Sequence, residues 1–599
     1  MSISLLSTAQ IRALSATAVQ GLSTTQVSSL SSTQLGALSS TGVNSLSVTQ
    51  VAALSTSQVR GLATTQIPFL SNSVSLSGQQ LAVLSQFQVQ AFTATQVSAL
   101  DSTAVAALGS TQVKALTTTQ LSALTTTDIG EFSSTQIGTL SVTQLGGLTT
   151  TGIGSLSTTQ IGGLSASQIG GLSATGLSTL DATQVAALAT TQIAGITATQ
   201  VRGMTTTDVG ELSATQVGAL SASQIGALSA SNVSALDATQ AAAITTTQIR
   251  GLATTQLTGL TTTDIGELSA TQVGALSASQ IGALSAGNVS ALDATQVGAL
   301  STTQLRGLST TQLSGLSTTD VGELSSTQIG GLGTTQLSAL GATNLASLST
   351  TQLSGLSSTQ VGGLSATAFS ALDATQVGSL SSTQVRGLTT TQLAGLSTTD
   401  VGELSATQIG GLSASQIGGL SATGLSTLDA TQVAALATTQ IAGITATQVR
   451  GLTTTDVGEL SATQVGALGL SQIAALSATN VSALDATQVA AVSTSQLRGL
   501  SATQLGGLST TDLGEFSATQ LSSLSSSQVS ALSTTVIGGL DATGLAPFTA
   551  TQIGGLSTTQ LDYLSTTNIS ALSETQIAGL DQTQVGSLSD DQIVAYLRL

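Results

Sequence analysis

The chain has 599 residues and a formal net charge of −17, with 40% hydrophobic, only 6% charged and 2% aromatic residues. It contains no histidine and no cysteine, which excludes a Ser-His-Asp triad, a thiolate metal site and disulfides. Ten cations in the whole chain are too few to neutralise a run of phosphates, so we expect no nucleic-acid partner. No apolar stretch approaches the length of about 18 residues that a transmembrane helix needs.

The sequence is built from an eight-residue unit, roughly L-S-T-T-Q-V-G-A, which repeats from Leu6 to Tyr596. Its leucine-type residue recurs at every eighth position to Leu70. After one slip it resumes at Leu76 and keeps its phase to Tyr596 without insertion or deletion. A repeat this short predicts one local unit stacked on itself, which is a solenoid. Octad positions are numbered below from the leucine as position one.

Positions two to five read S/T/D-x-x-Q, which is the capping-box signature of a helix N-terminus. The apolar positions one and six then have the spacing of a hydrophobic staple. Aspartate, one of the best N-cap residues, replaces Ser or Thr at position two in octads that recur along the chain (Asp101, Asp181, Asp237, Asp293, Asp373, Asp429, Asp485 and Asp541). Each octad is therefore predicted to hold one short helix that starts at its own cap.

A long helix or a coiled coil does not fit this period. Eight residues at 100° each overshoot two turns by about 80° per repeat, so a leucine stripe would wind around the helix. A β-solenoid is the alternative fold, because Thr, Val and Ile favour strands and glycine suits tight corners. Against it, the apolar residues are separated by five and then three positions, which breaks the period-two alternation of a half-buried strand. An α-solenoid of short helices is the favoured prediction.

The phase of the repeat divides the chain into four parts. Residues 1–70 form an N-terminal octad array, 71–83 the phase break, 84–580 the main octad solenoid, and 581–599 an atypical unit with added charges that caps the C-terminal end. Pro68 lies beside the break and removes a backbone donor, so the break is either a boundary between two arrays or a kink within one solenoid.

A variant octad, T-T-D-x-G-E, recurs at intervals of ten or seven octads and follows a cation at position seven of an earlier octad. Its carboxylates are the weak candidates for a metal site, with calcium as the metal: Asp128, Asp208, Asp264, Glu267, Asp320, Asp400, Asp456 and Asp512. The further oxygen ligands of an EF-hand loop are missing from the pattern. Ion pairs between neighbouring octads, such as Arg250 with Asp264 or Glu267, are the favoured interpretation.

No enzyme and no cofactor are predicted. Catalytic sites need concave and non-repetitive surroundings, and no insertion that would form a cleft interrupts the octads after the phase break. Rows of Ser and Thr hydroxyls instead suit a repetitive face that binds a polysaccharide, ice or a mineral.

The L-S-x-T-Q-[VI]-x-x octads resemble the Ser/Thr/Gly-rich short-repeat regions of large bacterial surface and secreted proteins of the adhesin-like type. This resemblance implies a structural, filament-forming or adhesive protein that associates with itself, at the cell surface or outside the cell. The N-terminus lacks the basic region and long apolar run of a classical signal peptide. An intracellular scaffold or ruler therefore stays open beside the ligand-binding face as an alternative function.

Overall fold

The computed structural model describes residues 3–71 and 75–598, which fall into two compact units, Met1–Leu300 and Ser301–Leu599. The described residues form 72 short α-helices and two 3-10 helices, and no β-strand occurs among them. The prediction of a short-helix solenoid is thus confirmed, and the alternative of a β-solenoid is wrong.

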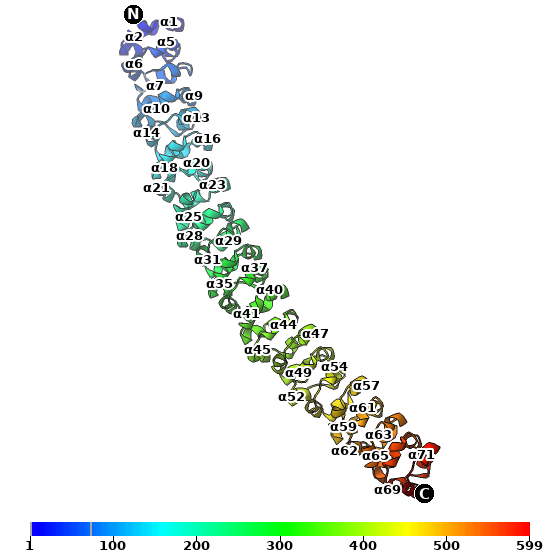
Figure 1. Ribbon diagram of the computed structural model, residues 1–599. Helices are drawn as coiled ribbons and strands as arrows, with labels where there is room; N and C mark the ends of the chain where they lie inside the picture. Colours follow the sequence, from blue (N-terminus) through cyan, green and yellow to red (C-terminus); the bar gives the residue numbers. More distant parts are fainter. Residues whose placement is uncertain (1–2, 72–74, 599) are drawn as a thin grey trace. The chain divides into compact units, whose positions relative to one another are not determined.

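The helices are four to seven residues long and follow the octad period closely (Figure 1). From α1 (Thr8–Arg12) to α7 (Thr56–Arg60), one helix starts at every eighth residue. The same spacing runs from α8 (Gly78–Ala82) to α72 (Asp590–Tyr596). The exception is α41 (Gly341–Ala346), which starts one residue early, at the only described residue with a positive φ.

Two 3-10 helices lie near the irregular parts of the repeat. One, η1 (Ile3–Leu5), precedes α1, and the other, η2 (Ile67–Phe69), contains Pro68 and lies between α7 and α8. The predicted phase break at 71–83 lies partly outside the described residues, because 72–74 are not described. The helix that follows the break, α8, contacts α7.

The predicted capping box forms the start of most helices. In α7, Ser55 has extended backbone angles, its hydroxyl accepts from the Gln58 N–H at 3.3 Å, and the Gln58 Oε1 accepts from the Ser55 N–H at 2.8 Å. Two of the four N–H groups that a helix start leaves unpaired are thereby satisfied. The apolar residues at positions six and one, Val59 and Leu62, are buried. Helices this short are not stable alone, so their stability comes from this burial.

Helix n packs against helix n+3, so three octads complete one coil of the solenoid. In the unit Met1–Leu300, α25 (Ala214–Ala219) packs against α28 (Ala238–Ala243), and the two lie side by side in Figure 1. In the unit Ser301–Leu599, α56 (Ala462–Gly466) packs in the same way against α59 (Ala486–Ala491). Leucine at position one and Val, Ile or Leu at position six fill the interior of each coil.

Small residues at positions seven and eight allow the coils to approach closely. A Cβ added to Gly36 would lie 2.5 Å from the carbonyl oxygen of Gly61, and one added to Gly61 would lie 2.6 Å from the Cβ of Ser32. Larger side chains at these points would force the backbones of two coils apart.

Candidate functional site

The side chain of the position-five glutamine bonds each coil to the one before it. In Gln58, Nε2 donates to the carbonyl oxygens of Val27 at 2.7 Å and Leu30 at 2.8 Å, while Oε1 keeps its bond within the capping box. Val27 and Leu30 lie at the end of α3 (Thr24–Ser28), four helices earlier. We call this arrangement the glutamine clasp: a position-five glutamine whose amide donates to the position-six and position-one carbonyls of an earlier coil.

The clasp recurs in both units. Gln192 donates to Ile161 at 2.8 Å and Leu164 at 2.7 Å, and Gln448 donates to Ile417 and Leu420, both at 2.8 Å. These acceptors are carbonyls at a helix C-terminus; the position-six carbonyl also accepts from the backbone N–H three residues later, as Ile161 does from Leu164 at 3.1 Å. The amide is thus satisfied at both its oxygen and its nitrogen although the side chains are almost fully buried.

The clasp persists across the phase break at a shorter spacing. Gln58 reaches back by 31 and 28 residues, whereas Gln80 donates to Val51 at 3.1 Å and to Leu54 at 2.6 Å, which are 29 and 26 residues earlier. The coil that crosses the break is therefore two residues shorter than the others and keeps the same hydrogen bonds.

The aspartate octads, those that read T-T-D-x-G-E, use position five differently. Oδ2 of Asp264 accepts from the Thr261 N–H at 2.7 Å, as a clasp glutamine would, and also from the Ser234 hydroxyl at 2.6 Å, thirty residues earlier. A carboxylate has no proton to donate, so the direction of the bond between coils is reversed. The carbonyl oxygen of Leu236, which a glutamine at this position would bind, has no donor among the described residues.

We call this arrangement the Ser–Asp pair. It joins a position-seven serine to an aspartate thirty residues later, and it occurs six times within the two units: Ser98 with Asp128, Ser178 with Asp208, Ser234 with Asp264, Ser370 with Asp400, Ser426 with Asp456, and Ser482 with Asp512. The seventh aspartate, Asp320, accepts from the Ser317 N–H at 2.8 Å in its own capping box.

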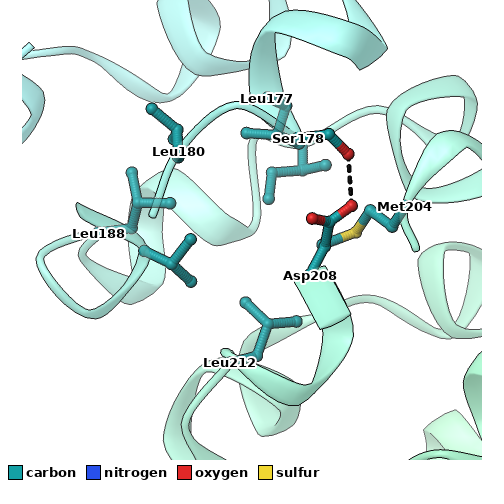
Figure 2. A pocket seen from close by; sticks show the side chains of 9 residues that line it. Leu177, Ser178, Leu180, Leu188, Met204, Asp208 and Leu212 are labelled. Carbon is teal, nitrogen blue, oxygen red and sulfur yellow. Dashed lines mark hydrogen bonds between the residues drawn. The ribbon is translucent and has the colours of Figure 1, made fainter. Parts of the chain in front are cut away.

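Small cavities lie beside the Ser–Asp pairs. Figure 2 shows Asp208 and Ser178 next to Met204 and a group of leucines that includes Leu177 and Leu180. The cavity has a volume of about 10 Å³, and its counterpart at Asp456 has about 20 Å³. Each is about the size of one water molecule, so neither can receive a substrate.

In the aspartate octad of Asp208 and Glu211, a third carboxylate lies near these two. It belongs to Asp181, which the sequence pattern did not connect with this octad. Burial raises the pKa of Glu211, and so do the charges of Asp208 and Asp181. Asp181 is the N-cap of α21 (Ala182–Ala186), the helix three places before α24 (Thr206–Gly210). The same causes raise the pKa of Glu131, Glu403, Glu459 and Glu515.

The candidate aspartates thus have structural bonds in the described chain, whereas Glu267 is the C-cap residue of α31 (Thr262–Gly266). Among the described residues, no group of three or more Asp or Glu side chains is arranged to hold a metal ion. For Asp512, burial raises the pKa, but hydrogen bonds from Ser482 and Ser509 outweigh it and leave the pKa below its ordinary value.

The predicted ion pair of Arg250 with Asp264 or Glu267 is not formed. Arg250 Nε instead points to the carbonyl oxygen of Ala275 at 3.4 Å, and Arg386 donates likewise to Gly411 at 2.9 Å. Each acceptor lies 25 residues further on, in the next coil. Arg250 and Asp264 are two octads apart, whereas helices stack at a distance of three, so the two side chains belong to different helix columns.

The capping box was predicted from the sequence, but the second use of its glutamine was not. Either Glu or Gln can complete a capping box. No octad of this chain has Glu at position five, and a glutamic acid would lack the amide protons that the two carbonyls accept. This complete preference for glutamine over glutamic acid is the signal that could have revealed the clasp.

A family model described as the ALTTAQ repeat matches residues 3–40, 105–142, 289–326 and 297–334. No curated protein matches the chain. The family match agrees with the tandem repeat that the octads and the helices show, and it adds no ligand or reaction. None of the described helices has both the length and the apolar character that a membrane crossing requires.

Proposed function

We propose that this chain is a structural repeat protein without catalytic activity, a spacer whose length is set by the number of stacked coils. The glutamine clasp is the observation that carries the proposal. It occurs in most octads, and it commits the buried position-five glutamine side chain to hydrogen bonds between coils. What remains exposed is a repetitive face of Ser and Thr hydroxyls.

The proposal also includes where the protein acts. The resemblance of the octads to repeat regions of bacterial surface proteins supports a site at the cell surface or outside the cell, with adhesion or filament formation as the role. An intracellular scaffold and a face that binds polysaccharide or ice are the competing outcomes of the test.

The test changes the number of coils in the full chain without disturbing the repeat. Deletion of residues 235–290 removes seven whole octads and leaves Ser234 thirty residues before Asp320. We expect this variant to stay helical and its maximum dimension in X-ray scattering to fall by roughly a tenth, because each coil contributes equally to the stack. An unchanged dimension would contradict the spacer.

Protease treatment of intact cells tests the location separately. We expect the chain to be cleaved without lysis. A chain that is protected until the cells are broken would favour the scaffold, and binding to glycan arrays or thermal hysteresis would favour the ligand-binding face.

A further inference from the structure

We propose that the Ser–Asp pairs are register marks, which determine which octads face one another in successive coils. The need for such marks follows from the repeat itself. A glutamine clasp binds only backbone carbonyls, and these are the same in every octad. If α7 slipped by one octad, Gln58 would find the carbonyls of Val19 and Leu22 in place of Val27 and Leu30. The clasp therefore cannot distinguish the correct coil from a slipped one.

The Ser–Asp pair does distinguish them, because its aspartate is buried at Asp400 and partly buried in the other five pairs, and it accepts from a hydroxyl that only certain octads carry. A slip that shortens the separation by one octad would place an alanine or glycine opposite each of the six aspartates: Ala106, Ala186, Ala242, Gly378, Ala434 and Ala490. A slip that lengthens it would place Gln90, Gly170, Gly226, Gly362, Gly418 and Ala474 there. Only Gln90 among these twelve residues has a side-chain donor, so in a slipped coil nearly every aspartate would lose its donor from the earlier coil and keep only the N–H of its own capping box.

The coil after each mark is matched to it as well. Position five of the octad 24 residues beyond each aspartate has a side chain shorter than glutamine: Gly152, Asn232, Asn288, Gly424, Asn480 and Val536. Asn232 donates to the carbonyl oxygen of Met204 at 2.8 Å, so it satisfies one carbonyl instead of two. A slip by one octad in either direction would replace this shorter side chain by a position-five glutamine. This holds for the six marks and both directions of slip, with the single exception of Gly544.

The intervals between marks spread them over the whole solenoid. Intervals of ten and seven octads both exceed a whole number of three-octad coils by one octad. Each mark therefore lies one helix column away from the mark before it. In the first unit the marks therefore lie on α14 (Thr126–Gly130), α24 and α31 (Thr262–Gly266), one in each of the three helix columns. No column of that unit is left with clasps alone.

Because the chain has no cysteine, disulfide formation can report the register directly. The Cβ of Ala366 lies 3.3 Å from a Cβ built on Gly395, close to the separation that a disulfide needs. The pair A366C/G395C therefore reports the native register. The pairs A374C/G395C and S358C/G395C report slips of one octad in either direction.

The decisive variant of the full chain replaces all seven aspartates by glutamine, which converts every mark into a clasp. A glutamine clasp can form when the residue thirty positions earlier is a serine. Gln384 is an example: its amide donates to the carbonyl oxygens of Leu353 and Leu356, both at 2.8 Å, and the residue thirty positions before it is Ser354. After unfolding in urea, refolding and oxidation, we expect only the native disulfide in the chain that keeps its marks. In the all-glutamine variant we expect the slipped disulfides to rise at least about tenfold, with unchanged helix content in circular dichroism.

Exclusive formation of the native disulfide by the all-glutamine variant would overturn the proposal. A second variant keeps the test decisive if that chain fails to fold. It moves every hydroxyl by one octad, for example by S370G with G378S, and leaves the aspartates in place. We expect the A374C/G395C disulfide to increase in this variant. An unchanged disulfide pattern would show that the backbone sets the register without the marks.

Discussion

The glutamine octads and the aspartate octads form the same hydrogen bonds at the start of their own helix, but their hydrogen bonds between coils run in opposite directions. Both complete a capping box at position five, as Gln58 and Asp264 do. Beyond that box, Gln58 donates to two backbone carbonyls, whereas Asp264 accepts from the side chain of one serine. The first bond can form above any octad, and the second only above an octad with Ser at position seven. Stability and specificity thus come from different copies of one repeat.

Loss of the clasp is expected to have the largest effect. Gln58→Glu keeps the oxygen of the capping box but places a carboxylate against the carbonyls of Val27 and Leu30, so we expect a loss of about 2–4 kcal/mol in local stability. Hydrogen exchange of the amides in α3 and α7 measures it. Gln26→Glu is the matched control, because Gln26 is exposed and its Oε1 accepts only within its own box. Equal effects of the two substitutions would contradict the clasp.

Removal of the serine from a mark should cost less. Ser370→Ala leaves Asp400, which is 8% exposed, without its hydroxyl donor, and we expect a loss of about 1–3 kcal/mol in urea unfolding or local hydrogen exchange. Adding Asp400→Gln to this variant should recover most of the loss by forming a clasp. Ser354→Ala, below the clasp of Gln384, is the control and should cost under about 0.5 kcal/mol. A double variant as weak as Ser370→Ala alone would show that the two octad types are not interchangeable.

The pH dependence of stability is expected to be the smallest difference. Five glutamates of the marks have a pKa raised above the ordinary value of 4.5, so the folded state binds protons before the unfolded state as the pH falls. Their contribution therefore favours folding more at pH 5 than at pH 7. Asp512 acts in the opposite sense, because its pKa lies below 3.8 and the stability it contributes is lost in stronger acid.

Urea unfolding between pH 3 and pH 8 measures this dependence. We expect a rise in unfolding free energy from pH 7 towards pH 5 and a fall below the ordinary carboxyl pKa. Replacement of the five glutamates by glutamine should flatten the rise and leave the fall. A rise that survives this replacement would assign it to other groups.

Much of the fold could be predicted from the octad because its signals are local. The S/T/D-x-x-Q pattern predicted the helix starts, and the drift of about 80° per octad ruled out a continuous helix. The number of octads in a coil could not be derived in this way, since it depends on how Val59 and its equivalents pack across coils. The pairing of residues thirty apart was likewise not visible, which is why Arg250 was assigned to Asp264 instead of to the carbonyl of Ala275.

The candidate site was predicted only in part. The aspartates were singled out from the repeat as candidate metal ligands, but their partner Ser234 and its equivalents were not identified. A serine at position seven is common in this chain, so it becomes informative only once the separation of thirty residues is known.

The direction of the clasp has a consequence for how the chain folds during synthesis. Every clasp described above joins a glutamine to carbonyls that lie 26 to 31 residues earlier, and none reaches towards residues not yet made. A coil on a growing chain is therefore completed as soon as the next one emerges. The loop that each clasp closes is equally short in the first coil and in the last, so the entropic cost of closure does not grow with chain length. Duplication of octads can lengthen such a protein without slowing the folding of any part of it.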